Sequence, residues 1–169
     1  SMVDGLKPSQ RKVVDACRKR KNTEIKVSQL AGYAATESAY HHGEQSMNTT
    51  IIGLAHNYVG SNNMNLLAPK GQFGTRLMGG KDAASPRYIF TMLSANCQKL
   101  IKSSDDPILV HLDDDGMKIE PKYYVPTLPI VLINGTEGIG TGYSSSVPCY
   151  NPEDIKQNIE NFLKKKPMV

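Results

Sequence analysis

The chain has 169 residues, 39% of them hydrophobic, and a formal net charge of +4 at pH 7. That length fits one domain of ordinary size, or one domain and the start of a second. No apolar run approaches the roughly 20 residues that cross a bilayer, so membrane-spanning classes are excluded and no membrane partner is expected. The three cysteines form no C-x-x-C pair, which argues against a disulfide framework or a zinc site and favours a reducing compartment.

Positive charge is concentrated at the N-terminal end of the chain. Residues 1–26 hold eight lysines and arginines against three acidic residues, a net charge of +5, which leaves −1 for the remainder. A charge block of this size predicts a surface that binds nucleic acid or another acidic partner. The alternative is a helix face that is only solvated.

Three helices are predicted in the first third of the chain. Pro8 suits the first turn of a helix over residues 8–21, and apolar residues at helical spacing predict a second helix over 27–37. A third helix should begin near His42 and run to about Tyr58, with a polar exposed face that carries almost no carboxylate.

The segment after these helices predicts β-structure around a loop. Runs at 64–67 and 87–93 are β-prone, and three helices followed by such runs are the order of a winged helix, a helix-turn-helix that carries a β-wing. The fold class is therefore predicted to be α+β. In this arrangement the third helix faces DNA and the wing reaches the DNA backbone.

A glycine-rich loop, residues 68–86, leads into an Arg-Tyr pair. Its glycines and three cations are typical of a loop that follows phosphate groups. Arg87 can favour the phenolate form of Tyr88 and stabilise charge on a phosphoryl group, so the pair is a candidate for nucleophilic attack on a phosphodiester. The alternative is that Tyr88 is a half-buried strand aromatic beside a solvated arginine.

The last third of the chain predicts strands, turns and one more helix. Strands at 108–112 and 117–120 should flank an Asp-Gly turn, and residues 123–134 are expected to form an apolar strand. Asn151 should cap a C-terminal helix. The inward face of this helix is predicted to be Ile155, Ile159 and Phe162.

Three groups invite a metal or nucleotide interpretation that their spacing does not favour. Asp113–Asp115 lies in a turn without EF-hand spacing, and Gly135–Gly142 lacks the helix that a dinucleotide fold needs. His41 and His42 lack the H-E-x-x-H spacing, so we expect phosphate contacts from both and a proton held or relayed by His41.

Ile139, flanked by glycines, is a candidate wedge between DNA base steps, and packing onto its own domain is the alternative.

Six motifs, spread in order over nearly the whole chain, carry a resemblance to a known family. They are Asp4–Lys12, Ser38–Gln45, Val59–Asn63, Gly71–Arg76, Gly79–Thr91 and Asn134–Gly142. These motifs closely resemble the breakage-reunion region of eukaryotic-type DNA topoisomerase II. Bacterial gyrase and topoisomerase IV differ around the histidines and the tyrosine, which points to the eukaryotic or large-DNA-virus branch. Tyr143, where relatives often have Trp, is a mild departure.

The resemblance implies roles for individual residues. Tyr88 is the expected nucleophile that forms a 5′-phosphotyrosyl link, Arg87 its transition-state partner, His41 and His42 support for the site, and Ile139 the intercalating wedge. None of these residues is expected to bind a metal. The residues expected to contact DNA are Lys7, Arg11, Lys12, Gln45, Lys70, Arg76, Lys81, Ser85 and Ile139.

The resemblance also implies domains and partners. Residues 1–2 are interpreted as a cloning remnant, 3–102 as a winged-helix domain and 103–169 as the beginning of an α/β tower domain in a longer protein. The full-length enzyme is expected to use Mg²⁺ and ATP, both bound outside this segment. Double-stranded DNA and the second protomer of a homodimer are the expected partners. The expected location is the nucleus or, for a large DNA virus, a cytoplasmic replication site.

Two functions follow for the segment. In the first it supplies the DNA-cleaving nucleophile, and alone it is expected to bind DNA weakly and cleave it poorly or not at all, because the metal-binding and ATPase domains lie elsewhere. In the second it is a non-catalytic winged-helix DNA-binding module in which Tyr88 is only structural.

Overall fold

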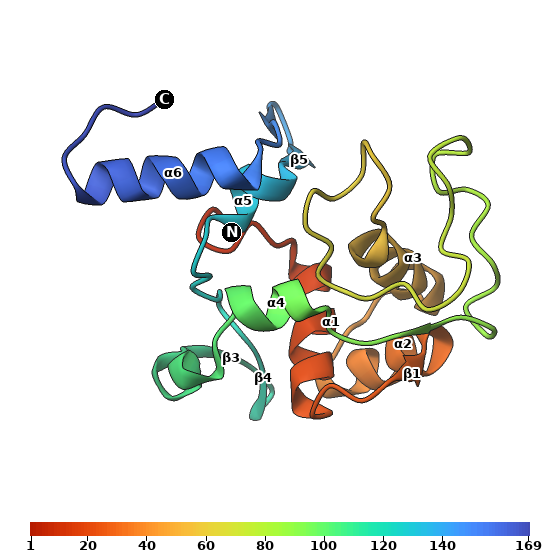
Figure 1. Ribbon diagram of the computed structural model, residues 1–169. Coiled ribbons are helices and arrows are strands. Elements are labelled where there is room, and N and C mark those ends of the chain that lie inside the picture. Colours follow the sequence, from red (N-terminus) through yellow and green to blue (C-terminus); the bar gives the residue numbers. More distant parts are fainter.

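Most of the helices form the central body of the molecule, small two-stranded sheets lie around it, and the C-terminal helix extends from one end (Figure 1). The computed structural model describes residues 1–169. In chain order the elements are α1 (Pro8–Lys19), β1 (Ile25–Lys26), α2 (Val27–Glu37), α3 (Glu44–Ala55), β2 (Phe90–Thr91), α4 (Ala95–Leu100), the 3-10 helix η1 (Ser103–Ile108), β3 (His111–Asp114), β4 (Met117–Pro121), α5 (Ile130–Asn134), β5 (Thr136–Ile139), β6 (Ser144–Val147) and α6 (Pro152–Leu163). The sheets pair β1 with β2, β3 with β4 and β5 with β6, all antiparallel, so the predicted α+β class is confirmed.

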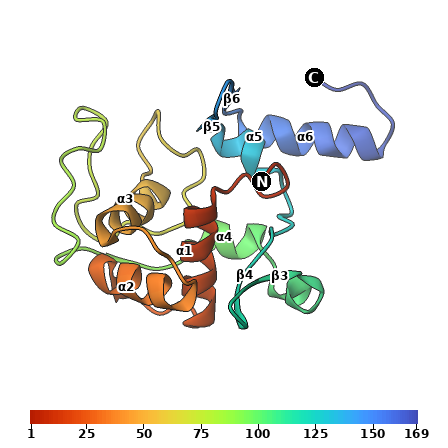
Figure 2. The same cartoon turned by 180° about the vertical axis from the view of Figure 1, so that it is seen from behind.

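The three N-terminal helices match the sequence predictions closely. α1 begins at Pro8 and ends before Lys21 and Asn22, because both of these residues have a positive φ. α2 covers the predicted residues, whereas α3 stops at Ala55, short of the predicted end, because His56 has an extended backbone. Figure 2 shows α1 between α2 and α3 on one side and the later elements on the other.

The β-prone runs beside the glycine-rich loop form less strand than predicted. Within 87–93 only β2 is a strand, with Thr91 opposite Ile25 of β1. Residues 64–67 form no regular strand: the Leu66 and Leu67 amides both donate to the Leu54 carbonyl at the end of α3, and the run pairs with 87–93 only through an isolated antiparallel bridge between Leu67 and Leu93. The end of α3 takes the two amide hydrogen bonds, while the Leu66 carbonyl still accepts from the Ser94 amide at 2.9 Å.

The predictions for the last third are partly confirmed. The Asp-Gly hairpin is present as β3 and β4, although its first strand begins only at His111; of the residues before it, Ile108 ends η1 and Leu109 is the C-cap of η1. The apolar strand at 123–134 is wrong: Pro129 lacks an amide hydrogen and caps the short helix α5. In α6, Ile155 is buried as predicted, but Phe162 is 71% exposed and does not face inward.

One hydrophobic core joins the helices to the later part of the chain. It holds 24 buried residues, and Ala31 and Ala34 of α2 are among them; side chains this small let neighbouring helices approach closely. Tyr124 and Ile130, which lie beyond α4, are buried in the same core. The chain around Tyr124 and Ile130 therefore packs directly on the helical body. None of the helices is long and apolar enough to cross a bilayer.

A buried ion pair joins the N-terminal segment to α1 and to the segment after β4. Asp4 is fully buried, and its carboxylate accepts hydrogen bonds from the Arg11 guanidinium at 2.7 and 2.9 Å and from the Tyr124 amide at 3.0 Å. The Tyr124 hydroxyl donates to Asp15 of α1 at 3.1 Å. Burial alone would raise the pKa of Asp4, but the hydrogen bonds from Arg11 and from the Tyr124 and Leu6 amides outweigh it and hold that pKa below its ordinary value of 3.8.

We predict that Asp4→Asn strongly destabilises the fold, because it leaves the buried Arg11 guanidinium without its counter-charge. Removing one partner of a buried pair costs about 3–5 kcal/mol, so the unfolding free energy measured by urea titration should fall by about that amount. Glu153→Gln is the control, because Glu153 and Lys156 form an exposed pair at 3.9 Å. Equal stability of the Asp4→Asn chain and the wild type would contradict the assigned role.

The same pair gives the stability a dependence on acid. The pKa of Asp4 is lower in the folded chain than its ordinary value of 3.8, so the stabilisation is fully present above that value and is lost as the pH falls through the folded-state pKa. The unfolding free energy should therefore decrease on acidification, and it should decrease less in the Asp4→Asn chain.

Candidate functional site

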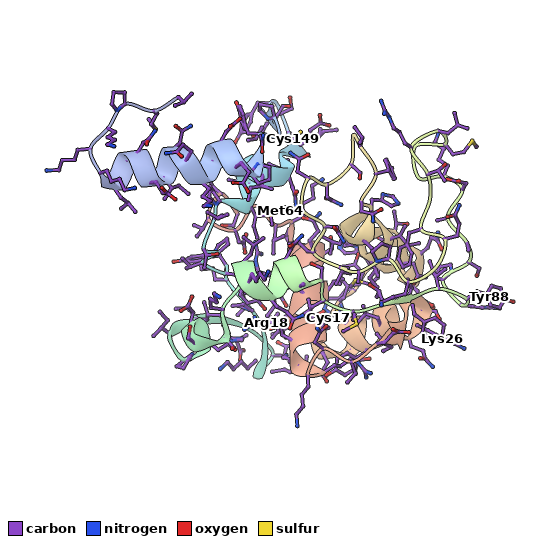
Figure 3. The ribbon with its side chains drawn as sticks, in the orientation of Figure 1. Cys17, Arg18, Lys26, Met64, Tyr88 and Cys149 are labelled. Atoms are coloured by element: carbon purple, nitrogen blue, oxygen red, sulfur yellow. The ribbon has the colours of Figure 1, made fainter.

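Tyr88 lies in a turn that is hydrogen-bonded to the start of α2. The Pro86 and Ile89 carbonyls on either side of it accept from the Ser28 and Val27 amides, each at 3.0 Å. Ile89 is buried, whereas the Tyr88 side chain is 77% exposed and points away from the body of the protein (Figure 3). The interpretation of Tyr88 as a half-buried strand aromatic is therefore wrong, and its hydroxyl is open to a large ligand.

Arg87 stands beside Tyr88 on the same turn. Its side chain is exposed, and its guanidinium forms no ion pair with any carboxylate of the chain. A guanidinium has five N–H donors in a fixed fork that matches phosphate oxygens. The turn therefore presents a phenol and an unpaired cation together to an anionic ligand.

Contacts of residues 73–75 and 80–82, which we call the neck of the glycine-rich loop, hold the loop in one shape. Asp82 accepts hydrogen bonds from the Thr75 amide and hydroxyl, both at 2.8 Å, and the bond from the amide is the main cause that lowers the pKa of this carboxyl. His56, just after α3, bonds to the Phe73 carbonyl at 2.7 Å. Gly80 has a φ of +80° and passes so close to His56 that a Cβ would lie 2.6 Å from the ring. The loop is thereby attached to the end of α3.

A cavity of about 840 Å³ lies between the start of α1, the connection from α2 to α3 and the tip of the β5–β6 hairpin. Its lining includes Lys7, Ser9, Lys12, His41, His42 and Ile139. Ile139 is 98% exposed, so the alternative that it packs onto its own domain is contradicted. The structure brings both predicted histidines and the predicted wedge to one concave surface, and Tyr88 lies outside this cavity.

The two histidines have neighbours that the sequence did not reveal. The Nε2 atom of His41 lies 3.7 Å from Asp114 Oδ2 in the β3–β4 hairpin, and His42 packs edge-on against Tyr40 with ring centroids 5.2 Å apart. No hydrogen bond or ion pair joins either histidine to Tyr88. Asp114 is distant in sequence from His41, so only the folded position of the hairpin shows this pairing.

Half of the cations in the N-terminal block are paired with carboxylates of the protein. Arg11 is only 4% exposed and is bound by Asp4, which contradicts its expected contact with DNA. Lys12 reaches the cavity, but its ammonium group donates to the Ser38 carbonyl at 2.7 Å and pairs with Glu120 at 2.8 Å. Further pairs of the block are Arg18–Asp106, Lys19–Asp15 and Lys19–Glu37. Four of the eight cations are therefore neutralised by the protein itself, and Lys7 and Lys21 remain exposed without an ion pair.

The other residues of the expected DNA-contact set lie at the surface. The exposed members are Lys7, Gln45, Lys70, Arg76, Lys81, Ser85 and Ile139. Gln45 lies in the first turn of α3, while Lys70, Arg76 and Lys81 belong to the glycine-rich loop. The glycine-rich loop therefore supplies three of the exposed cations of this set, and the N-terminal block supplies one, Lys7.

The residues present do not fit a magnesium site. No three His, Cys, Asp or Glu side chains are grouped so that they could hold a metal ion. In the aspartate run, Asp113 instead accepts a hydrogen bond from the Gly116 amide at 2.9 Å and so stabilises the hairpin turn.

Comparison with known proteins identifies the family. The family model for the DNA gyrase/topoisomerase IV A subunit matches residues 1–169, which is the whole chain. The chain belongs to the type II DNA topoisomerases. DNA topoisomerase 2 of Bombyx mori is 60% identical over 171 residues, which cover 100% of this chain and 11% of that topoisomerase. The mitochondrial DNA topoisomerase 2 of Dictyostelium discoideum is 57% identical over 156 residues, which cover 92% of this chain and 12% of that topoisomerase.

A solved topoisomerase structure places the segment within the family. The DNA-binding, cleavage and re-ligation domain of Plasmodium falciparum topoisomerase II matches with a TM-score of 0.97 and 54% identity, over 100% of this chain and 23% of that one. The chain therefore corresponds to part of the DNA-binding and cleavage region of eukaryotic topoisomerase II, and the predicted resemblance is confirmed. It spans about a tenth of the length of the topoisomerases that it matches.

We predict that Gly80→Ala opens the glycine-rich loop, because the new Cβ would lie 2.6 Å from the His56 ring and 2.8 Å from the Tyr58 hydroxyl. Gly79→Ala is the matched control: Gly79 also has a positive φ, but a Cβ there would meet no atom within 4 Å. Trypsin cleavage after Arg76 and Lys81 should be about tenfold faster in Gly80→Ala than in Gly79→Ala, which corresponds to about 1.4 kcal/mol of local stability. Equal cleavage rates would show that the contact with His56 does not hold the loop.

Proposed function

We propose that this segment supplies the DNA-cleaving nucleophile of an ATP-dependent type II DNA topoisomerase. Tyr88 attacks a DNA phosphodiester, forms a transient 5′-phosphotyrosyl link in a double-strand break used for strand passage, and then religates the strand. The observation that carries this proposal is the exposed Tyr88 hydroxyl on a hydrogen-bonded turn beside the unpaired Arg87, in a chain of this family.

The reaction is a transesterification, in which one phosphate ester bond is exchanged for another. A bond forms between Tyr88 Oη and phosphorus while the bond from phosphorus to the 3′ oxygen breaks; the phenol loses its proton and the 3′ oxygen gains one. Arg87 donates to the non-bridging oxygens and stabilises the charge that develops on them. The product is again a phosphodiester, so the reverse reaction reseals the strand without a new energy source. Position and charge stabilisation are therefore the main requirements.

We assign His41 and His42 to contacts with DNA phosphates at the cavity. His41 holds or relays a proton there, and Asp114, 3.7 Å away, orients its ring. Ile139 is placed to enter between base steps and bend the duplex, because it is an exposed apolar side chain at the tip of a hairpin.

Residues 3–102 constitute, in this proposal, a winged-helix domain. α1 to α3 are its helices, the pair β1–β2 is its small sheet, and the glycine-rich loop is its wing. α3 faces DNA and contributes Gln45, while the wing contributes Lys70, Arg76 and Lys81. Residues 103–169 begin the tower domain.

The remaining requirements are assigned to other parts of a longer protein. Mg²⁺ and ATP bind outside this segment, which has no side-chain cluster suited to a metal ion. The partners are double-stranded DNA and a second protomer of a homodimer. The proposed location is the nucleus. The mitochondrion is the second candidate, because one of the similar proteins is a mitochondrial topoisomerase.

We predict that Tyr88→Phe in the full-length enzyme abolishes the covalent protein–DNA adduct and keeps DNA binding, because the variant lacks only the attacking oxygen. The measurement is trapping of labelled duplex by denaturation, followed by electrophoresis, with DNA affinity measured in parallel. Tyr143→Phe is the control, since Tyr143 is equally exposed but lies on the β5–β6 hairpin. Adduct at the wild-type level in Tyr88→Phe would favour the non-catalytic binding module.

We predict that residues 1–169 alone show little cleavage of DNA in the presence of Mg²⁺, because the chain holds no metal cluster of its own. A plasmid nicking and relaxation assay compares the segment with the full-length enzyme at equal concentration. Robust turnover by the segment would refute the assignment of the metal to another part of the protein.

A further inference from the structure

The tip of the glycine-rich loop exposes two adjacent apolar side chains. Leu77 is 92% exposed and Met78 is 52% exposed. The tip is a tight turn, because the Gly79 amide donates to the Arg76 carbonyl and the Lys81 amide to the Met78 carbonyl, both at 3.1 Å. A single exposed leucine is ordinary on a protein surface. An apolar pair at the end of a loop with a fixed neck calls for an explanation.

The neck contacts present this tip in a fixed position. Asp82 closes the loop onto Thr75, and the Gly80 amide donates to the Thr75 carbonyl at 2.9 Å. The backbones of Gly74 and Gly80 approach so closely that a Cβ on Gly74 would lie 2.6 Å from Gly80 Cα. A tip held in this way can enter a partner without the loss of freedom that ordering a mobile loop would cost.

The charges around the tip favour an anionic partner. Lys70, Arg76, Lys81 and Arg87 are all exposed, and the carboxylate of this region, Asp82, is occupied by Thr75 and by Gln72. An apolar tip between cations fits the minor groove of DNA, which has phosphates along both rims and sugars along its walls. The minor groove is about 6 Å wide and so admits a loop tip, whereas the major groove admits a helix.

The loop also connects its tip directly to the cleavage residue. Figure 1 shows it as a long excursion that stands away from the helices, and Figure 3 places Tyr88 at the same edge of the molecule. We propose that Leu77 enters the minor groove of the bound duplex, with Met78 against the groove wall, and thereby sets which phosphate meets Tyr88. This role rests on the proposed function and makes Leu77 a positioning residue and not a catalytic one.

The test compares full-length enzymes on a duplex that has adenines and guanines on both sides of the cleavage point. Dimethyl sulfate methylates adenine N3 in the minor groove and guanine N7 in the major groove, so it reports on both grooves at once. The wild type should protect a short run of adenine N3 atoms. Leu77→Asn should lose this protection and should cleave at several neighbouring phosphates. Its affinity for DNA should be about tenfold lower, because one apolar side chain is no longer buried on binding.

Two further variants complete the design. Ile108→Asn changes another highly exposed apolar side chain, on η1, and should keep protection, affinity and cleavage position. Asp82→Ala keeps Leu77 but releases the neck, and it should lose adenine protection as Leu77→Asn does. Adenine protection that is retained in Leu77→Asn overturns the proposal. Guanine N7 protection that the wild type shows and Leu77→Asn loses also overturns it, because the tip would then lie in the major groove. An unchanged footprint with a changed oligomeric state in sedimentation would assign Leu77 to a protein contact and also overturn it.

Adduct formation separates this inference from the proposed function. A wild-type enzyme that forms no adduct through Tyr88 would contradict the proposed function itself. A wild-type enzyme that forms the adduct, with a footprint and cleavage position that Leu77→Asn leaves unaltered, would contradict only the role of the loop tip.

Discussion

The bond between Asp4 and Arg11 is the interaction on which the arrangement of the other parts depends. It lies where three segments meet: the N-terminal turn, α1, and the chain around Tyr124. A buried ion pair is weak evidence for added stability, since desolvation offsets much of the attraction, but it strongly disfavours alternatives in which one charge is left unpaired. It therefore fixes how the later residues lie against α1. The cavity walls depend on that placement, because one wall comes from α1 and another from the β5–β6 hairpin.

The helices α1, α2 and α3 could be predicted from the sequence because each one buries apolar residues at helical spacing against its neighbours, whereas the short helices α4 and α5 were not predicted. The strand predictions failed where an apolar run found another way to satisfy its backbone. Leu66 and Leu67 bond to the end of α3, and the run after Pro129 closes into a helical turn. The N-terminal cations show a different limit. Their sign is visible in the sequence, but their partners, such as Asp106 and Glu120, are distant along the chain.

The candidate site divides in the same way between local and distant information. Tyr88, Arg87 and Ile139 could be found from short motifs, because an exposed turn or hairpin tip is specified by its own residues. The attachment of the glycine-rich loop to His56 and the approach of Asp114 to His41 could not be found in this way, because each joins parts of the chain that only the fold brings together.

The pairing of β1 with β2 has a consequence for the order of folding. It consists of two residue pairs, and it connects parts of the chain that are separated by both α2 and α3. Contacts between distant residues close large loops, so they form slowly and gain little until the helices have already packed. The β1–β2 sheet, and with it the turn that carries Tyr88 next to β2, should therefore be among the last parts of the chain to fold. A partly destabilised chain would then lose the placement of its reactive phenol while most of its helical content survives.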